Sequence, residues 1–473
     1  MKALSGKMNL SMRACALLLM WAATAMVLSA QTFSVLHNFD RADGAVPEAR
    51  LMQGPDGYLY GTTYGGGFDF GTVFKITLAG TLTTVYGFCT ELDCADGTNP
   101  RAGLILATDG NLYGTTSTGG TGEFGTAFKI NPSTGARTTV YNFCSLIGCP
   151  DGEFPNGLVQ ATNGNFYGTT INANNGGPGT IFELTPGGTL TTLHTFCVPT
   201  CPDGADPEVG LLQAGDGNLY GISLNGGNCN EGIMFKTTPA GVETPVYSFC
   251  YPQGAQPTGL VQAAGGEFFG TTQAFGANNE GTAFKITPSG TLTTLYNFCS
   301  QPSCSDGSGA VGGVIQATDG NFYGTTFTGG ANNDGTVFKL TPAGTLTTLH
   351  SFVDTDGASP TVGLFQATNG TFYGVTSAGG ANGDGTVFSL DVGLGPFVET
   401  VPTSGAVGGN VRILGTSLMG ATSVTFNGIP ATFTVASHSL IKATVPTGAT
   451  TGSVQVTTPS GTLTSNVVFR VRP

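Results

Sequence analysis

The feature that most constrains this chain is a short segment that recurs at nearly constant spacing. Segments of the type Asn-Leu/Phe-Tyr-Gly-Thr-Thr are separated by intervals of 49 to 54 residues. Their glycines are Gly61, Gly114, Gly168, Gly221, Gly270, Gly324 and Gly374. Seven similar units of this length indicate a repeat architecture rather than one irregular core.

Each unit contains four strand-like runs, and residues 155–196 show them clearly. The runs lie at 157–161, 165–170, 179–185 and 189–196. Tight turns of the Asp-Gly-Asn and Pro-x-Gly types join the first run to the second and the third to the fourth. A Gly/Asn-rich loop joins the second to the third, and a D-G-x-x-P segment usually leads into the next unit. Four antiparallel strands per unit predict a β-propeller blade.

The ends of the repeat region predict a closed ring. The fourth-strand pattern occurs once on its own at residues 33–39, before the first complete unit, and the last unit, which ends at Leu390, lacks it. We expect the N-terminal strand to complete the last blade, which removes an exposed sheet edge. An open solenoid is the alternative. The predicted fold is therefore all-β, with a seven-bladed β-propeller of four-stranded blades over residues 31–393.

The repeats resemble the GloVer tandem-repeat family of secreted bacterial proteins. The shared pattern is G-L-V-Q-A-x-D-G-N-F-Y-G-T-T followed by G-T-V-F-K-L-T-P-x-G-x-L-T-x-L-Y-x-F, and it extends from about residue 32 to 392. The resemblance implies export, propeller-like repeats and variable means of surface attachment. It implies no established activity.

A different pattern begins after the last repeat, in residues 394–473. Short alternating runs between Gly and Pro turns suggest a small β-sandwich. The motifs P-T-S-G at 402–405, G-G at 408–409 and V-T-F-N-G at 424–428 resemble an IPT/TIG domain. That resemblance implies an immunoglobulin-like fold that acts as a spacer or an adhesive unit.

The first 30 residues have the three zones of a secretory signal peptide. A basic start precedes an apolar run at 14–28 and a small-residue exit that ends at Ala30. A membrane anchor is the alternative, but this run is shorter than the roughly 20 residues that cross a bilayer. We therefore expect cleavage before Gln31, no membrane span afterwards, and a secreted or cell-surface protein.

The charge balance excludes polyanionic partners. The formal charge is −13, and cleavage would remove Lys2, Lys7 and Arg13 but no acidic residue, which gives −16. Nucleic acid and anionic lipid bind to clustered Lys and Arg, which this composition does not supply. We expect an extracellular ligand such as a carbohydrate or a component of the cell envelope.

Ten cysteines remain after the predicted cleavage, and eight of them form close pairs along the chain. Three pairs have four residues between their members, the fourth has three, and all lie just beyond a fourth strand. In an exported protein this spacing favours local disulfides over a metal site. We expect the pairs Cys89–Cys94, Cys144–Cys149, Cys197–Cys201 and Cys299–Cys304, with Cys229 joined to Cys250 within one repeat.

The histidines and glutamines occupy repeated positions. His37, His194 and His350 share the fourth-strand position that tyrosine fills in four other repeats, which indicates a packing site with a polar tip rather than a catalytic histidine. Six first strands place a glutamine at one position, where the second repeat has Leu106. These amides form either a structural ring around the axis or a ligand site. They are Gln53, Gln160, Gln213, Gln262, Gln316 and Gln366.

Oxygen-bearing side chains also recur in the loops between the second and third strands. An acidic residue often precedes the glycine that opens the third strand, as in Glu280 and Asp334, and asparagines accompany it. Such oxygens suit calcium, but no calcium-loop motif is present, so solvated turn residues are the favoured interpretation. We expect no metal and no other cofactor. The asparagines predicted to contact a ligand are Asn278, Asn279, Asn332 and Asn333.

These patterns favour a non-catalytic exported binding or scaffold protein. No cluster of catalytic carboxylates is visible in the sequence, and the only tryptophan, Trp21, lies in the predicted signal peptide. An extracellular glycan lyase or hydrolase is one alternative, because propellers host many chemistries. A purely structural envelope protein is the other. We expect any ligand to dock on the face with the long loops, because recognition residues concentrate on loops held by a rigid scaffold.

Overall fold

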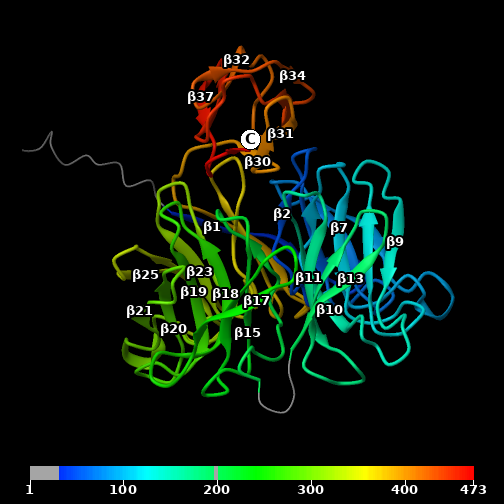
Figure 1. The fold of residues 1–473 in the computed structure, drawn as a ribbon. Coiled ribbons are helices and arrows are strands. Elements are labelled where there is room, and N and C mark those ends of the chain that lie inside the picture. Colours follow the sequence, from blue (N-terminus) through cyan, green and yellow to red (C-terminus); the bar gives the residue numbers. More distant parts are fainter. Residues whose placement is uncertain (1–30, 197–200, 473) are drawn as a thin grey trace, which may run out of the picture.

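The computed structural model describes residues 31–196 and 201–472. Seven four-stranded antiparallel sheets surround a common axis, and a small β-sandwich rests on one face of this ring (Figure 1). The predicted all-β propeller is thereby confirmed. Short 3-10 turns at Leu92–Cys94 and Pro302–Cys304 interrupt two of the connections between blades.

The blades follow one another along the chain, and each runs from an inner to an outer strand. The first three blades are β2 (Met52–Gln53), β3 (Leu59–Thr63), β4 (Thr72–Ile76) and β5 (Leu82–Gly87); β6 (Ile105–Leu106), β7 (Leu112–Thr116), β8 (Thr126–Ile130) and β9 (Arg137–Asn142); and β10 (Glu153–Gln160), β11 (Phe166–Asn172), β12 (Thr180–Leu184) and β13 (Leu190–Thr195).

The next three blades repeat this order. They are β14 (Leu212–Gln213), β15 (Leu219–Ser223), β16 (Ile233–Thr237) and β17 (Glu243–Ser248); β18 (Ala255–Gln262), β19 (Phe268–Ala274), β20 (Thr282–Ile286) and β21 (Leu292–Asn297); and β22 (Val314–Gln316), β23 (Phe322–Thr326), β24 (Thr336–Leu340) and β25 (Leu346–Ser351).

The seventh blade is assembled from both ends of the repeat region. Its strands are β26 (Phe365–Gln366), β27 (Phe372–Thr376), β28 (Thr386–Asp391) and, on the outside, β1 (Thr32–Asn38), which pairs antiparallel with β28. The predicted closure by the N-terminal strand is confirmed, and the open solenoid is excluded.

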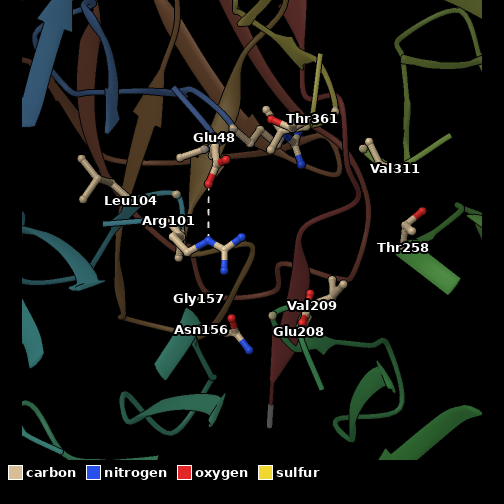
Figure 2. Close-up of a pocket in the computed structure, with 18 of the residues that line it drawn as sticks. Glu48, Arg101, Leu104, Asn156, Gly157, Glu208, Val209, Thr258, Val311 and Thr361 are labelled. Carbon is tan, nitrogen blue, oxygen red and sulfur yellow. Dashed lines mark hydrogen bonds and ion pairs between the residues drawn. The ribbon is translucent and has the colours of Figure 1, made fainter. Parts of the chain in front are cut away.

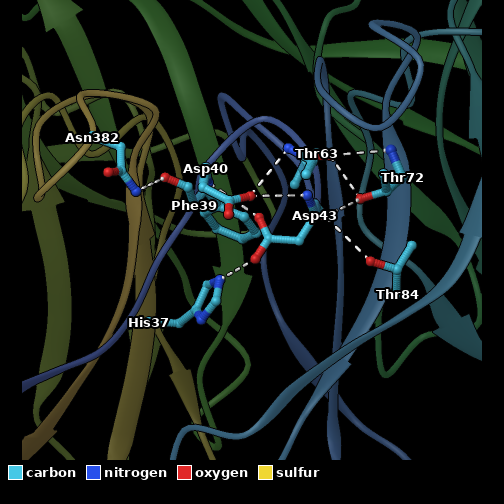
Figure 3. Close-up of polar contacts among 9 residues, drawn as sticks. His37, Phe39, Asp40, Asp43, Thr63, Thr72, Thr84 and Asn382 are labelled. Atoms are coloured by element: carbon cyan, nitrogen blue, oxygen red, sulfur yellow. Dashed lines mark hydrogen bonds and ion pairs between the residues drawn. The ribbon is translucent and has the colours of Figure 1, made fainter.

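The segment after β1 fastens the seventh blade to the first (Figure 3). The side-chain amide of Asn382 donates to the carbonyl of Phe39 over 2.8 Å, within the seventh blade. The His37 ring bonds the Asp43 carboxylate at 2.6 Å, and the Thr72 hydroxyl of the first blade donates to the Asp43 backbone carbonyl over 3.2 Å. This short segment therefore connects the seventh blade to the first blade.

Phenylalanine pairs hold neighbouring blades together. A phenylalanine at the end of each outer strand meets one on the third strand of the next blade, edge to face, with ring centroids 5.2 to 5.4 Å apart. All of these rings are buried. The pairs are Phe39–Phe74, Phe88–Phe128, Phe143–Phe182, Phe196–Phe235, Phe249–Phe284, Phe298–Phe338 and Phe352–Phe388.

The recurrent glycine of the second strand makes room for this core. A Cβ atom on Gly61 would lie 2.5 Å from the Cζ atom of Phe74 and 2.7 Å from a methyl group of Leu51. On Gly168 it would lie 2.6 Å from the Cζ atom of Phe182. The glycine that defines the repeat is thus required by the aromatic ring packed on the adjacent strand.

The C-terminal domain is a sandwich of two four-stranded sheets and a parallel pair. The sheets are β29 (Glu399–Val401), β31 (Asn410–Leu414), β35 (Leu440–Thr444) and β34 (Phe433–Val435); and β33 (Ile429–Pro430), β32 (Ser423–Phe426), β36 (Val454–Thr458) and β37 (Gly461–Thr464), with β30 (Ser404–Ala406) beside β38 (Arg470–Arg472). Val398, Ile413, Val454 and Phe469 belong to its separate apolar core.

The sandwich contacts the face that contains the tight turns between first and second strands (Figure 1). The Ser439 hydroxyl donates to the carbonyl of Pro55 over 2.9 Å, and Arg472 donates to the carbonyl of Thr162 over 2.7 Å. Arg412 donates in the same way to the carbonyl of Thr108. The opposite face, with the long loops and the disulfides, is left uncovered by this domain.

The predicted signal peptide, residues 1–30, lies outside the described residues. Within the part of the chain that the structure describes, no helix is long and apolar enough to cross a membrane.

Deletion of residues 31–42 should lower the melting temperature and promote association through the exposed edge of β28, because that strand loses its outer antiparallel partner, β1. Differential scanning calorimetry and light scattering would measure both effects. Deletion of residues 396–473 is the control, and it should leave the propeller folded because it removes no blade strand. Identical melting curves for the first deletion and the intact protein would contradict the closure.

Candidate functional site

A cavity of about 810 Å³ lies on the propeller axis, and every blade contributes to its wall. Most lining residues come from the stretch between the D-G-x-x-P segment and the inner strand. Because inner strands run from this stretch to the tight turns under the sandwich, the cavity belongs to the long-loop half of the ring. It lies in the volume range of small-molecule sites.

One position in each repeat dominates the wall, namely the residue after the last position of the D-G-x-x-P segment. We call these seven residues the axial ring, and Figure 2 shows their side chains around one space. The residue type at this position differs from repeat to repeat, and the ring contains acidic, basic, amide, hydroxyl and aliphatic side chains. Its members are Glu48, Arg101, Asn156, Glu208, Thr258, Val311 and Thr361.

The charged members of the axial ring come from the first, second and fourth blades. The Arg101 Nε atom bonds the Glu48 Oε2 atom at 3.3 Å, and the Arg101 guanidinium also lies 5.8 Å from the centre of the Tyr64 ring. Burial raises the pKa of Glu208, and the nearby Arg101 charge opposes this rise. Asp206 adds to it. Burial therefore favours the protonated form of Glu208.

A second arginine lines the cavity. The Arg50 guanidinium lies 5.9 Å from the centre of the Phe365 ring and interacts electrostatically with Glu399 of the sandwich. Burial lowers the pKa of Arg50 and raises that of Glu399, while each charge partly compensates the other. Arg50 keeps some solvent exposure although it is surrounded by protein, and it lines the cavity.

The polar uncharged side chains of the axial ring differ in whether they have hydrogen-bond partners. The Asn156 amide donates to the carbonyl of Pro207 over 2.5 Å, and the Thr258 hydroxyl donates to the carbonyl of Ala310 over 2.7 Å. Both bonds cross to the next blade. The Thr361 hydroxyl is buried and has no hydrogen-bond partner among the described residues. A buried hydroxyl without a partner has unmet hydrogen-bonding capacity, which a ligand that reached it would satisfy.

A second set of variable residues follows the Gly-Thr-Thr segment of the second strand. We call it the rim set, and it comprises Tyr64, Ser117, Ile171, Leu224, Gln273, Phe327 and Ser377. Ile171, Leu224, Gln273 and Phe327 line the cavity. Tyr64 and Phe327 are each 38% exposed, so two aromatic faces are accessible on the long-loop side.

The predicted glutamines link one blade to the previous one. The Oε1 atom of each accepts a backbone N–H from the tight turn of the preceding blade at 2.8 to 3.3 Å, and its amide donates to a carbonyl in its own turn. The donor–acceptor pairs are Thr108–Gln160, Thr162–Gln213, Gly215–Gln262, Ala264–Gln316, Thr318–Gln366 and Thr368–Gln53. Ligand contact by these amides stays a prediction.

The exception at Leu106 has a physical reason. The turn residue that should donate to the second blade is Pro55, which has no backbone N–H. A glutamine at position 106 would have no donor to accept from, and the repeat has a leucine there. Pro55 instead offers its carbonyl to Ser439 of the sandwich.

Three of the four predicted loop asparagines have side-chain hydrogen bonds to the backbone. The Asn278 amide donates to the carbonyl of Phe298 over 2.9 Å, and the Asn332 amide donates to that of Phe352 over 3.0 Å. The Asn333 side chain accepts from the N–H of Gly329, and Asn279 has a positive φ of 62°. These contacts give the residues a role in loop structure, and their ligand role stays a prediction.

The shared histidine and tyrosine position has a polar partner in most blades. The Tyr86 hydroxyl donates to Asp96 over 2.7 Å, and the His350 ring bonds Asp356 at 3.1 Å. The acceptor is the aspartate of the D-G-x-x-P segment in each case. Burial lowers the pKa of His350, and the Asp356 charge opposes that change.

Four of the expected disulfides are present in the structure. They are Cys89–Cys94, Cys144–Cys149, Cys229–Cys250 and Cys299–Cys304. The expected Cys197–Cys201 bond cannot be placed, because Cys197 lies outside the described residues. One described cluster, Cys144, Cys149 and Glu153, has metal-site spacing, but its two sulfurs are joined to each other and are not thiolates.

The acidic loop residues considered for calcium make contacts typical of turns. Asp384 accepts from the Arg41 Nε atom over 3.2 Å, and Asp334 accepts from the N–H of Asp354 over 3.1 Å. These bonds tie neighbouring loops to each other.

Two protein-family models match the chain. A model of the Gloeobacter/Verrucomicrobia repeat matches residues 23–152, 145–305 and 300–423. The chain belongs to the Gloeobacter/Verrucomicrobia repeat family. An IPT/TIG domain model matches residues 397–471, so the sandwich of this repeat protein is an IPT/TIG domain.

Two solved structures share the propeller-like fold of this Gloeobacter/Verrucomicrobia repeat protein. They are extracellular domains from B. thetaiotaomicron, assigned to a hybrid two-component and to a one-component system, with 10% and 11% identity and TM-scores of 0.50. Each match covers 94% of this chain, which spans only 59% and 58% of those domains. No curated protein sequence matches the chain.

Sequence reasoning missed the axial ring and the rim set. A proline directly precedes the axial-ring position in six repeats, and Ala310 takes its place in the sixth. If the repeats are aligned on this residue, the next position is seen to vary although the rest of the unit is regular. No motif marks the position, because no residue type recurs there.

Replacement of Gln53 by leucine should lower the free energy of unfolding by about 1–3 kcal/mol, because it leaves the buried N–H of Thr368 without an acceptor. Chemical denaturation would measure the change. Leu106→Gln is the matched control, and it should bring no gain in stability, since Pro55 has no N–H to donate. A stabilising Leu106→Gln, or a neutral Gln53→Leu, would contradict the role given to these amides.

Proposed function

We propose that this protein is an exported, non-catalytic binding protein that takes its ligand into the axial cavity from the long-loop face. The observation that supports it most directly is the axial ring. Seven equivalent positions in a regular repeat have diverged in charge, size and polarity around one cavity. Divergence of equivalent positions around a cavity is typical of recognition on a rigid scaffold.

The arrangement of the two faces supports the same proposal. The IPT/TIG domain contacts the tight-turn face through Ser439, Arg412 and Arg472, whereas no described residue of that domain lines the cavity. The four described disulfides lie in the long-loop region and restrain it before a ligand arrives. A restrained binding surface loses less conformational entropy on association.

Export rests on the leader pattern of residues 1–30 and on the disulfides, which persist in oxidising compartments. The structurally similar B. thetaiotaomicron proteins are extracellular domains, and the proposal extends that location to this chain. A secreted protein and one held at the cell surface both satisfy these observations.

One observation favours a second function, that of an extracellular glycan hydrolase or lyase. Glu48 and Glu208 line the same cavity, and burial raises the pKa of Glu208, as a general acid requires. Paired carboxyl groups of this kind serve glycoside hydrolysis. Against this function, Glu48 is held by Arg101 at 3.3 Å. A purely structural envelope protein is the third hypothesis, and it would bind no ligand in a saturable manner.

Arg101→Met should weaken ligand binding about tenfold with little change in melting temperature, because its guanidinium projects from the cavity wall and makes one exposed ion pair. The ligand would come from a glycan-array and envelope-fraction screen of the mature protein. Arg41→Met is the matched control, since Arg41 pairs with Asp384 on an outer loop. Binding lost in Arg41→Met but retained in Arg101→Met would place the site elsewhere.

The enzymatic alternative has its own test. Incubation of the mature protein with each bound glycan, followed by analysis of reducing ends and unsaturated products, detects hydrolysis and elimination. The binding proposal expects no product above background. Product formation that Glu208→Gln abolishes would replace it with the enzymatic function.

A further inference from the structure

We propose that the axial cavity recognises an uncharged, polyhydroxylated ligand, namely the end of a neutral saccharide chain. This inference rests on the proposed binding function and specifies the chemistry of that site. Three features of the wall support it: its charge balance, its unused hydrogen-bonding groups and its aromatic rim.

The cavity wall is electrically balanced within an acidic protein. Its charged lining residues are Glu48, Arg50, Arg101 and Glu208, two of each sign, whereas the chain has a formal charge of −13. A wall with no net charge gives no large electrostatic preference for a cation or an anion. The charged groups still offer strong hydrogen-bond donors and acceptors.

Several basic residues elsewhere in the propeller have partners within the protein. Lys75, Lys285 and Lys339 form ion pairs with carboxylates of nearby turns, and Arg137 lies within 6 Å of three aromatic rings. Arg50 and Arg101 differ because they line the cavity. Their charges are offset by Glu399 and Glu48, so they act as hydrogen-bond donors rather than as an anion trap.

The unused hydrogen-bonding groups of the wall suit a ligand with several hydroxyl groups. Arg101 contacts Glu48 through Nε, and Figure 2 shows its other two nitrogens directed away from Glu48 into the cavity. The Glu208 carboxyl can accept or, when protonated, donate. The buried Thr361 hydroxyl has no partner among the described residues. Figure 2 shows Thr361 and Glu208 on opposite sides of the cavity. Sugar hydroxyl groups are both donors and acceptors, and hydroxyl groups at different positions of a saccharide can satisfy side chains on different sides of the wall.

The rim offers apolar faces for a sugar ring. Phe327 lines the cavity and is 38% exposed, and Tyr64 is exposed to the same extent. An aromatic ring provides a large, rigid apolar surface with little loss of conformational freedom. The C–H face of a pyranose can pack against such a ring, while its hydroxyl edge meets the axial ring.

The IPT/TIG domain determines how a long ligand can enter. Its contacts with the turns at Pro55, Thr108 and Thr162 and with the carbonyl of Thr368 place it over the tight-turn face. The long-loop face is the entrance that remains. A saccharide chain therefore inserts its terminal units into the axial cavity and leaves its remaining units outside.

The test uses the mature full-length protein and an array of neutral, uronic-acid-containing and amino-sugar-containing oligosaccharides. We expect saturable binding of a neutral member. Isothermal titration should show that Thr361→Val and Phe327→Ala each weaken binding about tenfold. Thr347→Val, on an exposed position of β25, and Phe68→Ala, a loop residue 68% exposed, are matched controls that should leave binding within about twofold.

The outcomes separate this inference from the proposed function. Binding of a charged oligosaccharide that Arg101→Met weakens, with no binding of neutral ones, overturns the neutral ligand and retains the binding function. If the affinity for a neutral oligosaccharide is unchanged in Thr361→Val and Phe327→Ala but falls in the control variants, the ligand binds elsewhere and the proposed site is wrong. If no array member and no envelope fraction binds in a saturable manner, the proposed function itself fails.

Discussion

The edge-to-face contact between phenylalanines of neighbouring blades is the interaction on which this structure depends. It occurs at every junction, including the one made by Phe39 and Phe74 where the ring closes, with nearly constant centroid distances. Each blade is a thin sheet that cannot bury its faces alone, so its stability comes from its neighbours. The glycine of the second strand, the outer strand and the glutamine bridges all support this repeated contact.

A regular frame of this kind separates stability from recognition. Buried aromatic rings, blade-to-blade glutamine bonds and tight turns are repeated because each junction has the same geometry. The axial ring lies on the frame but contributes little to the junctions, apart from the bonds of Asn156 and Thr258 to the next blade and the ion pair between Glu48 and Arg101. Its side chains can therefore differ from blade to blade without loss of the fold.

The recurrent patterns of the sequence predicted the strands and blades, whereas the variable axial-ring position was not predicted. The count of strand patterns predicted that residues 33–39 pair with the last unit, and the positions of Cys229 and Cys250 in one repeat predicted their bond. The axial ring has no common residue type, so pattern recognition could not find it. The docking of Arg412 and Arg472 escaped prediction because both bind backbone carbonyls, which any residue provides.

The closing strand also sets a temporal order for folding. Thr32 pairs with Asp391, and Asn382 reaches the carbonyl of Phe39 from 343 positions away along the chain. β1 is synthesised first but finds its partner only after the whole repeat region exists. Contacts of such high sequence separation form late and slowly. Until then β1 and the outer edge of β28 are both unpaired, so a newly made chain is exposed to aggregation through these edges until the ring is complete.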